Sequence, residues 1–137
     1  MLLFGLLNFT FSKTQNIYDT YPVYKGNDLG LTFSSKSKIF KIWAPTAEQA
    51  QLILYKEGAG GDPLSTYPMT KKEEGVWEAN LIGEFKGWFY TFKVMINEQW
   101  QNEVPDPYAK AVGVNGKRAM VVDLQETNPV GWEKDKN

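Results

Sequence analysis

The sequence predicts an all-β protein, an immunoglobulin-like (early-set) β-sandwich of about seven or eight short antiparallel strands. Apolar and polar residues alternate with a period of two along much of the chain, and no stretch sustains a helical period. Turn-forming clusters of Gly, Pro, Asn and Ser recur at intervals of roughly 8–12 residues. A small closed β-barrel is the alternative architecture that fits the same pattern.

The first half of the chain contains three clear strand candidates, at residues 29–33, 38–44 and 50–56. The second of them ends at Pro45, which has no N–H to donate to a sheet. The following EGAGGDP segment, residues 57–63, is expected to be a flexible loop because it has three glycines in four residues. The alternation directs these residues toward the core: Leu29, Leu31, Phe33, Phe40, Ile42, Ala44, Leu52 and Leu54.

The second half continues with a weak, Pro-interrupted edge candidate at residues 65–69 and stronger strands at 76–81 and 88–96. A strand at 100–104 follows a tight turn. Asn115-Gly116 predicts a hairpin turn before the last strand, at 118–124. The residues expected in the core are Trp77, Ala79, Leu81, Tyr90, Phe92, Val94 and Ile96.

We expect three segments: a leader at residues 1–20, the sandwich at 21–125 and the start of a linker at 126–137. The opening MLLFGLLNFTF lacks a basic n-region and a cleavage motif, so it is either a signal-peptide remnant or an apolar leader packed on the domain. A remnant would indicate a periplasmic or secreted protein, and the other reading a cytoplasmic one. The run is too short for stable membrane insertion.

The composition excludes several function classes. The net charge is -1, and the lysines are scattered, which argues against nucleic acid as a partner. The chain has no Cys and no His, so Ser-His-Asp triads, His/Cys zinc sites and disulfides cannot form within it. No acidic loop has the spacing of a calcium site, and we expect neither a metal nor a cofactor.

Carboxylates give little support for catalysis by this chain. Glycoside hydrolysis needs two acids held at a defined separation, and nearly all the Asp and Glu residues fall in turns or at solvent-facing positions. Asp106 differs because Pro105 and Pro107 flank it, so its carboxylate is expected to cap a local turn.

The tryptophans divide into two groups. Trp77 fits the core. Trp43, Trp88 and Trp100 are expected to be exposed, and an exposed tryptophan often marks a docking surface. Trp100 stands within NEQWQN, where Asn102 and its polar neighbours could bond the hydroxyls of a sugar stacked on the indole. Burial against a neighbouring domain explains these exposed aromatics equally well.

Several segments together resemble the N-terminal β-sandwich of type I pullulanases, a family-48 carbohydrate-binding module. They are YPVYKGNDLGLTF, FKIWAPTAEQAQLILY, GVWEANLIG, GWFYTFKV, DPYAKAVGVNGKRAMVVDL and NPVGW, and the match covers roughly residues 21–132. Type I pullulanases are bacterial enzymes that debranch starch-like α-glucans by hydrolysing α-1,6-glucosidic linkages. In them the catalytic residues belong to a separate (β/α)₈ barrel.

The resemblance implies a non-catalytic module whose partner is its own catalytic barrel, with α-glucan as a second candidate partner. It places interdomain packing at Asp106, Pro107, Tyr108, Val114 and Asn115. The remaining rival is an immunoglobulin-like protein-interaction domain without any link to carbohydrate.

The resemblance also bears on sugar binding. Glycogen-binding relatives use two tryptophans, a lysine and an asparagine. Trp100 matches the second tryptophan and Asn115 the asparagine, while Thr91 stands at the lysine position. The loop of the first tryptophan has none, and Tyr67 is the nearest aromatic. The expected result is weak glucan binding or none.

Overall fold

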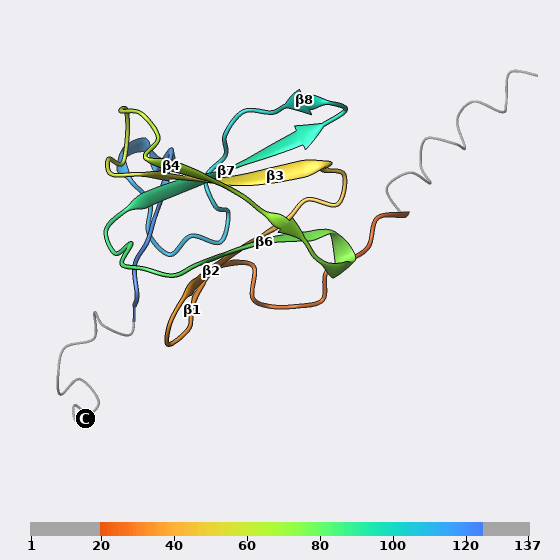
Figure 1. Cartoon of the computed structure of the whole chain (residues 1–137), viewed down its shortest axis with the longest axis horizontal. Helices are drawn as coiled ribbons and strands as arrows, with labels where there is room; N and C mark the ends of the chain where they lie inside the picture. The colour runs from red at the N-terminus through yellow and green to blue at the C-terminus, as the bar shows by residue number, and fades with distance from the viewer. Residues whose placement is uncertain (1–19, 125–137) are drawn as a thin grey trace, which may run out of the picture.

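The computed structural model describes residues 20–124, which form nine β-strands and two short 3-10 helices. The predicted leader, apart from Thr20, and the predicted linker lie outside the described residues. The strands form two antiparallel sheets that face each other, as Figure 1 shows. The predicted sandwich is thereby confirmed, and the closed barrel is not observed. No helix among residues 20–124 is long and apolar enough to cross a membrane.

One layer, the β2 sheet, has the strand order β1-β2-β6-β5. Its strands are β1 (Gly30–Phe33), β2 (Lys38–Trp43), β6 (Val76–Leu81) and β5 (Thr70–Lys71). The other layer, the β7 sheet, has the order β4-β3-β7-β8, and β9 also pairs with β7. Its strands are β4 (Ser65–Pro68), β3 (Gln49–Tyr55), β7 (Phe89–Ile96), β8 (Gln99–Trp100) and β9 (Ala119–Met120). The 3-10 helices are η2 (Glu73–Gly75) and η3 (Val114–Gly116).

The core lies between the two sheets and is centred on aromatic rings. Phe40 of β2 meets Tyr90 of β7 edge-to-face, with ring centroids 4.9 Å apart, and Tyr90 also contacts Phe92 in this way at 5.8 Å. Such pairs stabilise a core beyond the area they bury. The alternation predicted this inward set, which also includes Leu52, Leu54, Trp77, Ala79 and Leu81.

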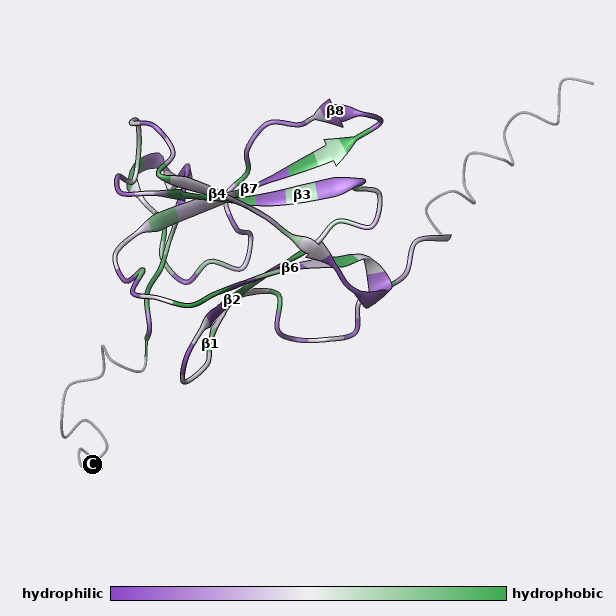
Figure 2. Cartoon of the chain, in the orientation of Figure 1, coloured by the Kyte–Doolittle hydropathy of each residue, from purple (hydrophilic) through white to green (hydrophobic). Residues whose placement is uncertain are grey.

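Leu29, which was predicted for the core, is half-buried just before β1. Two further residues predicted for the core lie at its margin. Phe33 is exposed and Ile96 is half-buried. Each is the last residue of its strand, where the opposite sheet no longer covers the side chain. Figure 2 shows the hydrophobic end of β7 beside the hydrophilic β8 at this margin.

The predicted strand at 100–104 is interrupted by a β-bulge. Trp100 is paired with Met95, but Val104 is paired with Phe92, so the second segment has one more residue than β7 between these points. A bulge reverses the side to which the following side chains point. Glu103 therefore faces outward, on the same side of the sheet as Trp100, which an uninterrupted strand would not allow.

The last predicted strand is shorter than expected, although the turn before it is confirmed. Asn115 and Gly116 both have a φ of 63°, the left-handed conformation favoured by Asn-Gly turns. The turn brings Val112 opposite Ala119. Beyond β9, the N–H of Val121 donates to the Trp88 carbonyl at 2.8 Å, which continues the pairing past the assigned strand.

Replacing the central ring should destabilise the fold strongly. Phe40 is fully buried, so Phe40→Ala should lower the free energy of unfolding by about 3–5 kcal/mol through lost burial and a residual cavity. Phe33→Ala, at the exposed end of β1, is the matched control and should cost far less. Urea unfolding of both variants measures this, and equal losses would contradict the central role of Phe40.

Candidate functional site

Trp100 lies on the outer face of the β7 sheet, directly opposite Met95. Because side chains alternate along a strand, Met95 and Lys93 share this face. Gln51 of β3 is the cross-strand partner of Lys93. The Trp100 side chain is 36% exposed. An indole beside an ammonium and an amide is able to stack on a sugar ring and bond its hydroxyls.

Glu103 anchors a polar cluster on the same face. One oxygen, Oε2, accepts hydrogen bonds from the Tyr55 hydroxyl at 2.5 Å and the Thr91 hydroxyl at 2.7 Å. Burial and then the Glu103 hydrogen bond raise the pKa of Tyr55 to about 12, so its hydroxyl stays protonated. Thr91 is only 2% exposed. The residue at the predicted lysine position is therefore committed to the fold and is not open to a ligand.

Lys93 is the residue that sequence reasoning missed. It follows Thr91 by two positions on β7 and so occupies the same outer face, nearer to Trp100. Counting back by two from Met95, the partner of Trp100, reaches Lys93. The sequence alone does not give this pairing, because the register of β7 and β8 depends on the conformation of the turn between them.

Asn115 and Trp100 are not brought together. Trp100 pairs at the Met95 end of β7. Asn115 belongs to η3, and the preceding Gly113 packs against the side chain of Phe89 at the opposite end. Phe89 and Met95 are separated by roughly 20 Å along the strand, and Figure 1 shows β8 and the η3 segment at different ends of the sheet. The predicted shared site of Trp100 and Asn115 is not formed.

Arg118 ties down the glycine-rich loop at that opposite end. Its guanidinium lies 3.4 Å from the ring centroid of Tyr55 and donates to the carbonyls of Glu57 and Gly60, at 2.7 and 2.6 Å. The loop predicted to be flexible is thus anchored through its backbone. The two hydrogen bonds join this loop to Arg118, the residue just before β9.

The remaining predicted sugar-binding residues are dispersed. Trp88 is half-buried: Phe85 packs edge-to-face on it, and the Lys56 ammonium lies 3.9 Å from its ring centroid. The expectation of an exposed Trp88 was therefore wrong. Trp43 is 41% exposed, but it belongs to the β2 sheet on the other side of the sandwich. Asn102 is exposed next to Trp100, within the bulge.

Asp106 is buried inside the domain. Only 4% of it is exposed, and its carboxylate accepts the Tyr90 hydroxyl at 2.7 Å and the Tyr108 N–H at 2.8 Å. The second bond is the turn cap that the flanking prolines predicted. Burial raises the pKa of Asp106, while the two hydrogen bonds oppose that shift. An interdomain contact by Asp106 itself is excluded, because its side chain faces the core.

The other predicted packing residues are exposed. Pro107, Tyr108, Val114 and Asn115 all lie on the surface, with Tyr108 57% exposed. Tyr108 also lines a groove of about 240 Å³ between β1 and the segment after β9. Exposed Phe33 and Leu124 line the same groove. Thr32, Lys110 and Asp123 line it as well, so the groove combines exposed apolar side chains with polar ones, as interfaces between proteins do.

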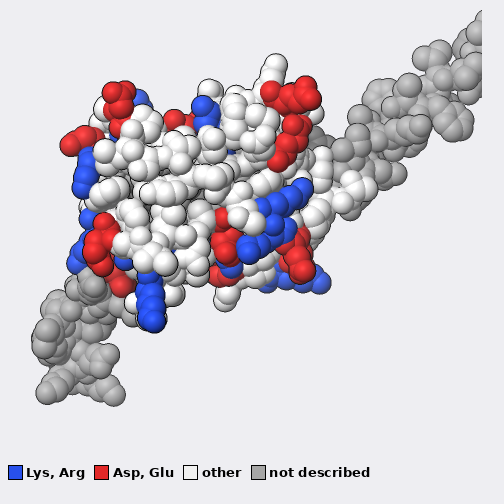
Figure 3. Space-filling model, in the orientation of Figure 1, with Lys and Arg blue, Asp and Glu red and all other residues white. Residues whose placement is uncertain are grey.

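Charged side chains form no metal site in the described part of the chain and no single-signed patch on the face drawn in Figure 3. Among residues 20–124, no group of three or more His, Cys, Asp or Glu is placed to hold a metal ion. In the view of Figure 3, lysines and acids are interspersed, and a large part of the face carries neither. This distribution suits neutral ligands better than polyanions.

Comparison with known proteins gives a consistent result. The family model for carbohydrate-binding module 48 (isoamylase N-terminal domain) matches residues 28–109. A pullulanase of Bacillus subtilis is 35% identical over 99 residues, which cover 72% of this chain and 13% of the relative.

Solved structures agree with the sequence relatives. The apo pullulanase of Paenibacillus barengoltzii is 43% identical with a TM-score of 0.78, over 88% of this chain and 18% of that one. A mutant of this enzyme has been crystallised in complex with maltotetraose. Pullulanase from Bacillus acidopullulyticus is 38% identical with a TM-score of 0.76, over 85% and 14% of the two chains. The present chain thus spans less than a fifth of each of these relatives.

Asp106 should make stability depend on pH. A carboxyl group whose pKa is higher in the folded protein contributes stability that is complete below its unfolded value of 3.8 and is lost as pH rises through its folded value. Wild type should therefore gain stability relative to Asp106→Asn as pH falls from 7 toward 4. Urea unfolding of both proteins across this range tests the slope. Parallel curves would contradict a raised pKa.

Proposed function

The chain belongs to the carbohydrate-binding module 48 family, in the form found in pullulanases, and from this we propose that it is a structural module docked on the catalytic domain of a type I pullulanase. The parent enzyme would hydrolyse α-1,6-glucosidic linkages in pullulan and branched α-glucans. The 137 residues match less than a fifth of such enzymes and contain no catalytic barrel. The rival of an interaction domain unrelated to carbohydrate has no support from these relatives.

The observation that carries the docking proposal is the groove beside β1. Phe33, Tyr108 and Leu124 line it with exposed apolar surface. Leu124 is also the residue from which the chain continues toward its C-terminal end, so sequence that follows starts at the groove. A catalytic domain joined there would cover these side chains and remove them from water.

The chain alone should not hydrolyse glucans. Asp106 is engaged inside the fold by Tyr90, and Glu103 beside Trp100 is occupied by the Tyr55 and Thr91 hydroxyls, so neither is free to act as one of the two acids that hydrolysis needs. Purified chain incubated with pullulan should release no reducing ends above a buffer blank. Release that persists through repeated purification would contradict a non-catalytic role.

Docking is tested in the enzyme that carries this module. Tyr108→Asp replaces an exposed aromatic ring of the groove with a charge, which docking would bury, so it should lower the temperature at which pullulanase activity is lost. Glu98→Gln, in the exposed turn before β8, should not. The isolated chain should unfold at nearly the same temperature with either change. An unchanged enzyme would contradict docking at this groove.

A second function, weak α-glucan binding, is favoured by the arrangement of Trp100, Lys93 and Gln51 on one face. One aromatic platform and one ammonium are available, so the expected affinity is in the millimolar range. Thr91 is buried and bonded to Glu103, and Asn115 lies at the other end of β7, so neither residue is part of this proposed site. The relative crystallised with maltotetraose supports the class of ligand, a short α-glucan.

Maltoheptaose should shift the backbone amide resonances around Lys93, Met95 and Trp100 in a saturable manner. Trp100→Ala should abolish these shifts, because the stacking of a glucose ring on the indole is lost with the indole. Asn115→Ala is the discriminating control, and it should leave binding unchanged because Asn115 lies at the other end of β7. A comparable loss of affinity in both variants would contradict this proposal and support a single site that includes both Trp100 and Asn115.

A further inference from the structure

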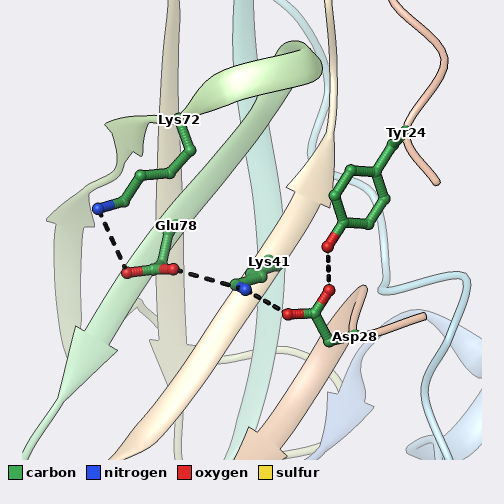
Figure 4. A network of polar contacts seen from close by, with 5 residues as sticks. All are labelled: Tyr24, Asp28, Lys41, Lys72 and Glu78. Carbon is green, nitrogen blue, oxygen red and sulfur yellow. Dashed lines mark hydrogen bonds and ion pairs between the residues drawn. The ribbon is translucent and has the colours of Figure 1, made fainter. Parts of the chain in front are cut away.

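A chain of polar contacts crosses the outer face of the β2 sheet, opposite to the face that carries Trp100. The Tyr24 hydroxyl donates to Asp28, whose other oxygen accepts from the Lys41 ammonium. Lys41 also faces Glu78 at 3.7 Å, and Glu78 faces Lys72 at 3.7 Å. Figure 4 shows the five side chains in a row, joining the segment before β1 to β2, β6 and the β5–β6 connection.

This row borders an open trough of about 700 Å³. Its lining residues include three lysines and three glutamates, and Asp28 of the row adds a fourth carboxylate beside Lys41, so both signs are present in nearly equal number. Tyr24 adds an aromatic ring. The lining residues are Tyr24, Lys41, Lys71, Lys72, Glu73, Glu74, Val76 and Glu78.

The two ion pairs of Glu78 leave bonding capacity for a ligand. At 3.7 Å, the Lys41 and Lys72 nitrogens are too far from its oxygens for direct hydrogen bonds. An ammonium has three donors and a carboxylate about four acceptor sites, so a sugar hydroxyl can bridge the two groups by accepting from the nitrogen and donating to the oxygen. The Asp28 hydrogen bond raises the pKa of Lys41, and Lys41 and then Tyr24 lower that of Asp28, so both remain charged at neutral pH.

We propose that this trough is a second carbohydrate-binding surface, which takes a neutral oligosaccharide, an α-glucan segment of several glucose units. The Tyr24 ring provides the apolar platform, and the Lys72–Glu78–Lys41 row alternately donates to and accepts from the sugar hydroxyls. Trp43, on the same outer face and opposite the lining residue Val76, flanks the trough with a second exposed aromatic ring.

The charge balance selects this occupant over others. A polyanion such as nucleic acid requires a net positive surface, which the trough lacks. A cation site requires converging carboxylates, and among residues 20–124 no three are placed to hold a metal ion. A protein docking site would present a more apolar centre. A neutral polyol uses donors and acceptors in equal measure, which is the composition that the trough offers.

The test uses the 137-residue chain with Trp100→Ala, which removes the site proposed on the β7 sheet. Maltoheptaose is titrated to millimolar concentration and backbone amide shifts are followed. We expect saturable shifts at Lys41, Lys72 and Glu78. Shifts that vanish in Trp100→Ala while wild type binds would overturn this second surface and leave the proposed Trp100 site standing.

Two further substitutions separate sugar contact from loss of local structure. In the Trp100→Ala background, Tyr24→Ala should weaken binding at least fivefold, whereas Tyr24→Phe keeps the ring and should bind within about twofold of the parent. Lys72→Met, on a different segment, should also weaken binding at least fivefold, and Lys36→Ala, in the β1–β2 turn, should not. Equal affinity in Tyr24→Ala, Lys72→Met and Lys36→Ala would overturn the proposal.

A final control concerns the type of ligand. Affinity for maltoheptaose should change less than twofold between 50 and 500 mM salt, because a neutral sugar displaces no counterions. The same titration with a sulfated oligosaccharide should give no saturable shifts at low salt. Saturable binding of the sulfated sugar in preference to maltoheptaose would instead identify an anion site and overturn the assignment.

Discussion

The buried carboxylate of Asp106 is the constraint on which the closure of the sandwich depends. It accepts hydrogen bonds from Tyr90, in the centre of the β7 sheet, and from the backbone of Tyr108. Gly30, at the start of β1, has a φ of +90°, and a Cβ there would lie 3.0 Å from the carboxylate. The segment after the β-bulge is thus held against both sheets, and moving it would leave a buried carboxylate without donors, a costly state.

Closing the sandwich in this way leaves the chemistry to the outer faces. The inner faces are filled with apolar side chains, so the polar clusters around Glu103 and Lys41 lie on the two outer surfaces. On the β7 sheet, Tyr55 and Thr91 are committed to Glu103, which leaves the end with Lys93 and Trp100 available. Tyr55 and Thr91 can reach Glu103 because the bulge turns Glu103 to the same side of the sheet as Trp100.

The sequence was sufficient where local patterns decide the outcome. Period-two alternation placed Phe40, Tyr90 and Trp77 in the core, and the prolines around Asp106 predicted its turn cap. It was insufficient where residues distant in sequence meet. The bond from Tyr90 to Asp106, the cover of Lys56 over Trp88 and the separation of Asn115 from Trp100 depend on strand register, which no single segment encodes.

A module with weak sugar contacts on opposite faces is still useful when it is attached to an enzyme. Linking two sites makes the second contact intramolecular, with an effective concentration that reaches the millimolar range for short linkers. Millimolar contacts through Trp100, and through the trough beside Tyr24, would therefore be occupied while a branched glucan is held elsewhere on the same protein. Faces pointing in opposite directions suit a branched or entangled polymer, because each can engage a separate strand. Weak contacts also release quickly, so the enzyme is not trapped on its product.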